Sequence, residues 1–470
     1  MIQLAPIDVA LILAYFVGLL LLGLWRSRRD SHAVDDFLIA GRKLTLPAFV
    51  ASLVSTWYGG ILGVGEFSYR YGISNWIVFG VPYYLYAIVF AVFLAARARR
   101  SRYYTIPDQL ERAYGRRASI AGAGFIFLLS LPAPYLLMLG ILMQLLWPVP
   151  LWLTIALAGL FSLLYIVRAG LQAVVRTDIL QFALMFAGFA VLVGMAIHQF
   201  GGLAFLQQQL PASHWQWHGG NPLQYILVWY VIAMATLVDP NFYQRCYAAR
   251  SERVARNGIL ASVVFWFIFD ALTTAAGLYA RAALPDLANP VESYPRLAML
   301  LLPDVARGLF FIALFATIMS TLDSFFFVSA VTIGKDILAR LVNSGGGTNH
   351  FQNLTRIGMG ITLVLSVALA IGNPSVIEIW YQLGSVATPA LLAPLMASHS
   401  SRWVMRGQAA LWCMLLSGGI SLIWLTVSVW RGHNFLGIEP IFPGLLLSVA
   451  IFVADHWLRP NGQTVTKANR

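Results

Sequence analysis

Apolar stretches alternate with short polar gaps along nearly the whole chain, from residue 7 to residue 458. Thirteen of these stretches approach the roughly 20 residues that a helix needs to cross a bilayer. They are 7–25, 47–71, 75–96, 120–146, 151–168, 176–200, 222–244, 257–281, 308–333, 353–372, 376–398, 408–430 and 440–458. The runs are continuous rather than alternating, which indicates helices and not the strands of a barrel. The pattern predicts an all-α membrane protein with about 13 transmembrane helices.

Basic residues occupy every second gap. With the N-terminus outside, 26 of the 31 Lys and Arg residues fall on the inner side. One inner group holds Arg245, Arg250, Arg253 and Arg256. This asymmetry predicts an integral, multi-pass protein of the plasma (inner) membrane with an outer N-terminus and a cytoplasmic C-terminus. The net charge of +12 then reflects topology and contact with a bilayer rich in anionic lipid, and not nucleic-acid binding.

Composition supports the membrane prediction and argues against an enzyme. Apolar residues make up 59% of the chain and charged residues 11%, whereas a soluble domain carries about 25% charge. Cys246 and Cys413 cannot form a disulfide framework. The sequence shows neither a His-Glu metal cluster nor a Ser/His/Asp arrangement at a spacing that suits catalysis.

Two of the predicted helices are interrupted by polar residues. In 47–71 the aliphatic run gives way to Ser55–Gly60 (STWYGG), and in 222–244 it ends at Asp239 and Pro240. Polar backbone at mid-membrane depth is tolerated where it lines a cavity. Interruptions at matching positions of two halves point to a transporter binding site. The alternative is that the glycines only allow close helix packing.

The segment 308–333 carries a hydroxyl-bearing face. Thr317, Ser320, Thr321 and Ser324 stand at i, i+3, i+4 and i+7, with Asp323 at the margin of the face. Several oxygen ligands in an apolar span suit a small hard cation. Alternatively, the hydroxyls bond to carbonyls of their own helix, which leaves Asp323 unexplained.

Further acidic residues fall within or next to predicted spans and are functional candidates for that reason. They are Glu66, Asp178, Asp239, Asp270 and Glu378. Asp178 and Asp239 lie closest to predicted helix ends, so we expect water to reach both of them.

Six short stretches carry a resemblance to a known family. They are 35–44 (DDFLIAGRKL), 55–72, 104–117 (YTIPDQLERAYGRR), 170–178 (GLQAVVRTD), 239–245 (DPNFYQR) and 320–324 (STLDS). In this order they make the chain similar to the sodium:solute symporter family over nearly its full length. Residues 55–72 and the pair Trp380 and Tyr381 most resemble the choline and proline branches.

The resemblance implies a LeuT-type fold of two inverted five-helix repeats, with one helix before the core and two after it. The implied parts are an N-terminal extra helix and inner loop (1–46), the first repeat (47–200), the second repeat (201–398), and two C-terminal helices with a cytoplasmic tail (399–470). The implied activity is sodium-coupled secondary active symport that imports a small polar organic solute. We expect a monomer or weak oligomer.

The resemblance also implies ligands for the co-transported sodium ion. The main site would use backbone carbonyls of Leu53, Thr56 and Thr317 with the hydroxyls of Ser320 and Thr321. A second sodium position, nearer the cytoplasm, would use Asp178, Ser320, Asp323 and Ser324. Asp178 could instead ease the release of sodium toward the cell interior.

The substrate site implied by the resemblance lies between the interrupted helices and their neighbours. Its candidate residues are Trp57, Gly60, Tyr135, Asp239, Asp270, Trp380 and Tyr381. Tryptophan faces bind quaternary ammonium groups, but Asp239 stands where the choline branch has a further Trp. A core rich in acids and poor in Arg favours a cationic or zwitterionic solute, although a helix N-terminus could also hold a carboxylate. Trp57 could also serve core packing alone.

Two other functions remain compatible with these residues. A proton-coupled transporter of the same fold could use Asp323, Asp178 or Glu66. A transporter-like membrane sensor would act with a separate signalling partner.

Overall fold

The computed structural model describes residues 2–24, 34–342, 348–373, 375–400 and 402–458, and within these ranges every regular element is a helix, apart from one isolated backbone bridge. The α-helices are α1 (Pro6–Leu24), α2 (Val34–Ile39), α3 (Leu46–Ser55), α4 (Ile61–Tyr71), α5 (Val81–Phe90), α6 (Ala96–Ser101), α7 (Ile106–Tyr114), α8 (Arg116–Leu129), α9 (Ala133–Leu146), α10 (Leu151–Phe200), α11 (Leu203–Gln209), α12 (Leu223–Ile232), α13 (Pro240–Ala248), α14 (Glu252–Ala283), α15 (Ser293–Leu301), α16 (Ala306–Val331), α17 (Ala339–Leu341), α18 (Thr348–Gly372), α19 (Val376–Ser398), α20 (Gly407–Arg431) and α21 (Ile441–Trp457).

Short 3-10 and π-helical segments connect or continue these helices. The π-helical segments are η2 (Trp76–Gly80), η3 (Ala91–Ala95) and η7 (Thr332–Leu338). The 3-10 segments are η1 (Ala40–Arg42), η4 (Ala212–Trp215), η5 (Ala233–Val238), η6 (Pro290–Glu292) and η8 (Phe435–Gly437).

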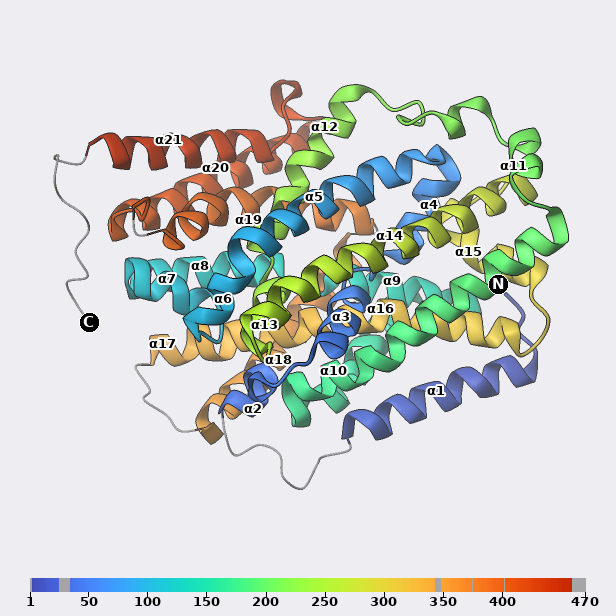
Figure 1. Cartoon of the computed structure of the whole chain (residues 1–470), viewed down its shortest axis with the longest axis horizontal. Helices are drawn as coiled ribbons and strands as arrows, with labels where there is room; N and C mark the ends of the chain where they lie inside the picture. Colours follow the sequence, from blue (N-terminus) through green and yellow to red (C-terminus); the bar gives the residue numbers. More distant parts are fainter. Residues whose placement is uncertain (1, 25–33, 343–347, 374, 401, 459–470) are drawn as a thin grey trace.

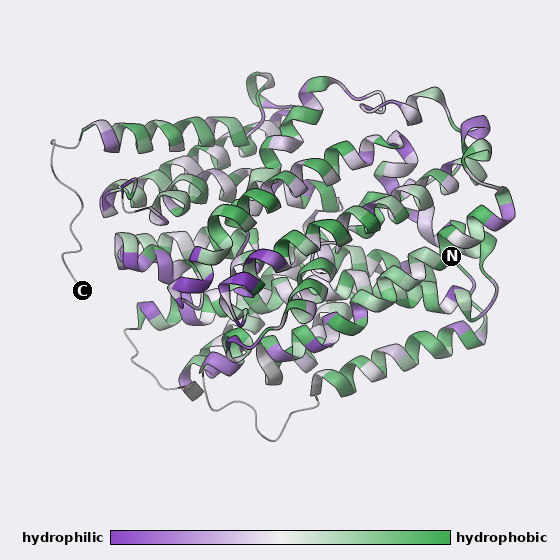
Figure 2. Cartoon of the chain, in the orientation of Figure 1, coloured by the Kyte–Doolittle hydropathy of each residue, from purple (hydrophilic) through white to green (hydrophobic). Residues whose placement is uncertain are grey.

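The helices run side by side in one bundle, with the start of α1 at one end and the end of α21 at the other (Figure 1). The helix α1 lies along one side of the bundle, and α20 and α21 lie along the opposite side. Apolar residues cover most of the length of the helices, while hydrophilic residues gather near the end that carries α6 and α7 (Figure 2). This distribution is the one expected of helices that cross a bilayer.

Every one of the thirteen predicted segments falls on helical structure, and the all-α prediction is confirmed. Within the described ranges, nine helical stretches are long and apolar enough to cross a membrane on their own. Three shorter apolar helices accompany them, at Leu46–Ser55, Leu151–Val167 and Ile441–Trp457. The count of 13 crossings therefore stays a prediction.

Two predicted helices are interrupted where the sequence indicates. The segment 47–71 is divided into α3 and α4, and 222–244 is divided into α12, η5 and α13. The pair α3–α4 and the pair α12–α13 run in opposite directions along the bundle (Figure 1), as inverted repeats require. A parallel bridge between Leu44 and Ala249 ties the start of α3 to the end of α13.

A third interruption divides the predicted segment 120–146, where Ser130–Pro132 separate α8 from α9. A fourth irregularity lies inside α10, which joins the predicted segments 151–168 and 176–200 at Gly170. Gly170 has a φ of 63°, which side chains rarely adopt, and a Cβ there would collide with the carbonyl of Phe37. Glycine at this position therefore lets the chain turn against α2.

The buried carboxylate of Asp8 attaches α1 to the start of α16. Its Oδ1 accepts the backbone N–H groups of Val305 (2.8 Å) and Gly308 (3.1 Å), and Arg307 lies 3.8 Å from its Oδ2. A carboxylate at a helix N-terminus satisfies free N–H groups and complements the helix dipole. Asp8 thus caps α16 from a separate helix.

We expect Asp8→Ala to lower the free energy of unfolding by about 2 kcal/mol, because the first turn of α16 loses its cap. Thermal unfolding of the purified protein in detergent measures the change. The matched control is Asp304→Ala, which removes the exposed partner of Arg307 and should change stability by less than about 0.5 kcal/mol. Equal effects of the two substitutions would contradict the capping role.

Candidate functional site

The connection between α3 and α4 lies in the interior of the bundle and faces α16. Residues 56–60 are not α-helical, and Thr56 is almost completely buried. Gly59 lies so close to α16 that a Cβ would approach side-chain atoms of Thr321 and Tyr135 at 2.5 Å. Carbonyl groups at the end of α3 lack the N–H donors of a continuing helix and carry the negative end of its dipole. This end of α3 can therefore accept a cation.

The hydroxyl-bearing face of α16 meets this end of α3. The Oγ atoms of Ser320 and Ser55 lie 2.8 Å apart, and the Thr321 hydroxyl lies 3.3 Å from the carbonyl oxygen of Ser55. Both α16 side chains are fully buried. The Thr317 hydroxyl instead bonds to the carbonyl of Ala313 (2.7 Å) in its own helix. The Thr321 hydroxyl also lies 3.4 Å from the Thr317 carbonyl of its own helix, so back-bonding accounts for Thr317 and partly for Thr321, but not for Ser320.

A cavity of about 180 Å³ lies beside the connection. The structure brings all seven predicted substrate residues to its wall: Trp57, Gly60, Tyr135, Asp239, Asp270, Trp380 and Tyr381. They come from the α3–α4 connection, α9, the start of α13, α14 and α19. Most other lining residues are apolar or aromatic, among them Phe79, Trp229 and Phe325.

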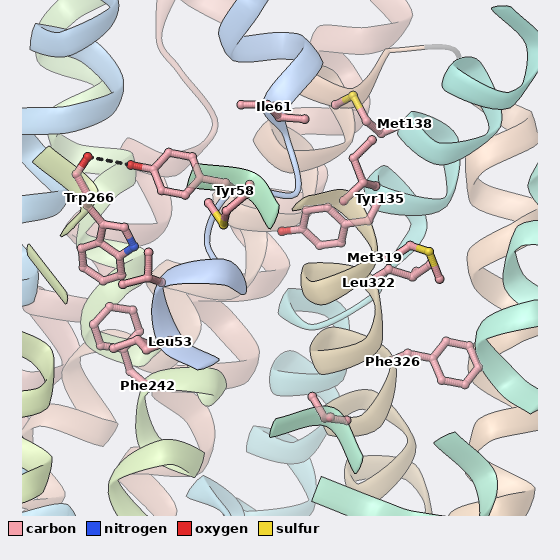
Figure 3. Close-up of a cluster of buried hydrophobic side chains, with 14 of the residues drawn as sticks. Leu53, Tyr58, Ile61, Tyr135, Met138, Phe242, Trp266, Met319, Leu322 and Phe326 are labelled. Carbon is pink, nitrogen blue, oxygen red and sulfur yellow. Dashed lines mark hydrogen bonds between the residues drawn. The ribbon is translucent and has the colours of Figure 1, made fainter. Parts of the chain in front are cut away.

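Aromatic rings pack against Trp57, which lines this cavity. The ring of Trp57 lies 5.4 Å from Phe242 and 5.3 Å from Trp266, measured between centroids. Tyr58 extends away from Tyr135 and donates a 3.0 Å hydrogen bond to the carbonyl of Trp266 (Figure 3). Trp57 thus both packs in the core and lines the cavity, so the two roles considered for it are compatible.

Two carboxylates reach the cavity, and no Lys or Arg is among its lining residues in the described part of the chain. Asp239 caps α13, since its Oδ1 accepts the N–H groups of Asn241 (2.7 Å) and Phe242 (3.2 Å). Asp270 accepts the hydroxyl of Tyr84. Asp239 does not lie at a helix end open to the surface, because the helix end that it caps lies inside the bundle; the residue is 9% exposed and faces the cavity.

Arg245, which the charge pattern assigns to an inner gap, is fully buried within α13. It lies 3.6 Å from Asp178 of α10, measured from Nη2 to Oδ2. Asp178 is also fully buried and does not line the cavity, so the expectation that water reaches it is wrong. Its two oxygens accept hydrogen bonds of 2.5 Å from Ser52 and from Ser320.

The four residues of the predicted second sodium position do not all gather in one place. Ser324 accepts a 2.6 Å hydrogen bond from Arg245 and therefore belongs with Asp178 and Ser320. Asp323 instead accepts the hydroxyl of Tyr165, from the first half of α10. The remaining acidic candidates lie farther out: Glu66 pairs with Arg70 at 3.1 Å, and Glu378 is exposed.

The family model described as "Sodium:solute symporter family" matches residues 37–419, which is most of the chain. The chain belongs to the sodium:solute symporter family. Membership supports sodium-coupled symport of a small-molecule solute, and it makes the chain an integral membrane transporter and not an enzyme.

Relatives of this symporter differ in the solutes that they are named for. The sodium/pantothenate symporter of Escherichia coli is 25% identical, with 92% of each chain covered. The osmoregulated proline transporter OpuE of Bacillus subtilis is 23% identical over 93% of this chain and 91% of its own length. The high-affinity choline transporter 1 of Drosophila melanogaster is 21% identical over 95% of this chain and 77% of its own.

Solved structures confirm the LeuT-type fold of the symporter. A sodium-coupled sialic acid symporter in a substrate-bound outward-open state matches with a TM-score of 0.77 at 17% identity, with 96% of this chain and 97% of the other covered. The nucleobase-cation-symport-1 family transporter Mhp1 in a closed conformation matches with a TM-score of 0.59 at 13% identity, with 90% and 95% covered.

Residues that the sequence analysis did not assign to the site also take part. Arg245 and Ser52 join Asp178, and Leu131, within the α8–α9 interruption, lines the cavity. The signal for Arg245 was its place at the end of DPNFYQR, directly after an interrupted helix. The signal for the third interruption was the Pro132 and Pro134 pair.

Substitution of Gly60 tests the close contact at the cavity wall, because a Cβ there would overlap the indole of Trp380. We expect Gly60→Ala to destabilise the protein by about 1–3 kcal/mol as Trp380 is displaced. Gly63→Ala is the matched control on α4, since nothing lies within 4 Å of its Cβ position. It should stabilise the helix slightly. Thermal unfolding measures both variants, and unchanged stability of Gly60→Ala would contradict the contact.

Proposed function

We propose that this protein imports a small cationic or zwitterionic organic solute together with sodium, by alternating access across the plasma membrane. The observation that carries the proposal is the contact of Ser320 and Thr321 with the end of the interrupted helix α3, directly beside the cavity. An intact helix and an interrupted one meet there through oxygen atoms. The repeats that would move are residues 47–200 and 201–398.

The main sodium site in this proposal takes carbonyl oxygens of Leu53, Thr56 and Thr317 and hydroxyl oxygens of Ser320 and Thr321. The set is supported by the end of α3, whose dipole favours a positive charge. It is also supported by Asp178, which accepts the Ser320 proton at 2.5 Å and so leaves the oxygen lone pairs of Ser320 free for sodium.

Coupling between sodium and solute follows from shared residues. Thr56 lines the cavity and would also provide a sodium ligand, and Trp57 follows it directly in the cavity wall. Sodium would hold this connection against α16 and thereby order the solute site. The coupling free energy is reciprocal and typically about 1–3 kcal/mol.

The charge of the cavity supports a solute with a positive group. Asp239 and Asp270 lie in the wall, and the described lining residues include no basic side chain to balance them. The aromatic faces of Trp57 and Trp380 suit an ammonium group. A zwitterion is compatible because its carboxylate could be held by backbone N–H groups of the α3–α4 connection.

The proposed orientation places the N-terminus outside and the C-terminus in the cytoplasm. It is supported by the opposite ends of the bundle at which α1 begins and α21 ends (Figure 1). The inner end would then hold the ion pairs of η7 and α17 with α7, including Lys335 with Asp108 at 2.5 Å and Arg340 with Asp108 at 2.7 Å.

Removal of the site hydroxyls tests the sodium assignment. We expect Ser320→Ala and Thr321→Ala each to weaken sodium binding by about tenfold or more, because each loses an oxygen ligand in a buried site. Equilibrium binding of radioactive sodium to the purified protein measures the change. Ser329→Ala is the matched control: this hydroxyl of α16 bonds to Ser130, away from the site, and should leave the sodium affinity unchanged. Wild-type affinity in both site variants would refute the assignment.

A thermal-shift screen tests the solute class. We expect amines or amino acids to raise the unfolding midpoint when sodium is present and to do so weakly without it, because sodium orders the cavity wall. Carboxylates and neutral nucleobases provide the comparison. Stabilisation by anions alone would contradict the charge argument, and stabilisation that follows pH and ignores sodium would favour proton coupling.

A further inference from the structure

The guanidinium of Arg245 uses all five of its N–H groups on oxygen acceptors. An arginine side chain has one N–H group on Nε and two on each Nη, and here each nitrogen has as many acceptors as it has hydrogens. The acceptors are Ser52 Oγ for Nε (3.3 Å), Asn241 Oδ1 and Gln244 Oε1 for Nη1 (3.0 Å each), and Thr56 Oγ1 (3.0 Å) and Ser324 Oγ (2.6 Å) for Nη2. The Asp178 carboxylate lies at 3.6 Å and supplies the opposite charge.

These acceptors form a cation site in chemical terms. Every one is an oxygen atom, one neighbour is a carboxylate, and the side chains involved are buried. Hard cations take ligand sets of this kind, whereas a buried charge without partners is strongly disfavoured. These oxygen atoms therefore form a site for one positive charge, and the guanidinium of Arg245 occupies that site.

The site occupied by Arg245 lies next to the proposed main sodium site. Ser324 follows Ser320 by one turn of α16, on the side toward η7. Thr56 accepts from Arg245 through its hydroxyl, while its carbonyl belongs to the proposed sodium ligands. Asp178 contacts both the proposed main sodium site and the site occupied by Arg245. One of its oxygens accepts a hydrogen bond from Ser320, and the other lies nearest Arg245.

We propose that Arg245 is a tethered cation that takes the place of a second sodium ion, so that the protein binds one sodium per chain. The inference rests on the proposed sodium-coupled function. A second sodium at Asp178, Ser320 and Ser324 would share these ligands with the guanidinium, and two positive charges in contact repel each other. Arg245 also balances Asp178 and thereby limits how strongly that carboxylate holds the main sodium ion.

Counting sodium sites tests this inference without knowledge of the solute. The probe is radioactive sodium, bound at equilibrium to the purified full-length protein in detergent. The wild type should bind one sodium per chain. Arg245→Ala removes the guanidinium but leaves the oxygen atoms and the charge of Asp178, so it should bind two. Arg296→Ala, which removes an arginine that pairs with Glu292, is the matched control and should bind one.

Two further variants separate charge from structure. Arg245→Lys keeps the positive charge and should bind one sodium. Asp178→Asn leaves the guanidinium unbalanced near the main site and should weaken sodium binding about tenfold. Neutralising both charges, with Asp178→Asn and Arg245→Gln together, should restore affinity to within about threefold of the wild type. A merely structural role of Arg245 would not produce this rescue.

Several results would overturn the inference. These are two sodium ions per chain in the wild type, a single site of wild-type affinity in folded Arg245→Ala, or no rescue in the doubly neutralised variant. If Arg245→Ala does not yield folded protein, the inference is tested by the number of sodium ions that the wild type binds and by the sodium affinity of the doubly neutralised variant. Absence of any saturable sodium binding in the wild type would instead refute the proposed function itself.

Discussion

A bilayer interior offers no hydrogen-bond partners, so a helix that is interrupted inside the bundle must satisfy its freed backbone groups from within the protein. The rest of the site depends on this constraint. At the end of α3, the carbonyl of Ser55 accepts from Thr321. At the start of α13, the carboxylate of Asp239 accepts two N–H groups. One interruption thus exposes carbonyls and the other exposes N–H groups, and each recruits a partner of opposite polarity.

The same constraint requires buried charged groups to find partners within the protein. Asp178 and Arg245 are both fully buried, and each lies among hydroxyl or amide groups of neighbouring helices. A charge pair of this kind adds little stability in itself, because removing both ions from water is costly. It does, however, define which helices meet and where. The pair joins α10 and α13, and its hydroxyl partners extend the contact to α3 and α16.

The sequence alone predicted well which segments form helices, because apolar length and the periodicity of hydroxyl groups are local properties. The break at Ser55–Gly60 and the exposed carbonyls that it creates follow from glycine and hydroxyl residues next to each other in the chain. Ser320 and Thr321 were identifiable from their spacing on one helix, and their contact with the end of α3 agrees with it. The resemblance to a family then indicated which residues line the cavity, and all seven meet there.

Only the tertiary structure decided the partners of the charged residues. Arg245 follows an interrupted helix and is succeeded by three more arginines, so by charge pattern it resembles an inner loop residue. Its acceptors lie as far as 193 residues away, and Asp178 is buried because α3 and α16 close over it. Local sequence determines where a helix begins, how long it is and which face is polar. Whether a charge on that face meets water or an opposite charge depends on which helices pack against it, and that choice is made by contacts between distant parts of the chain.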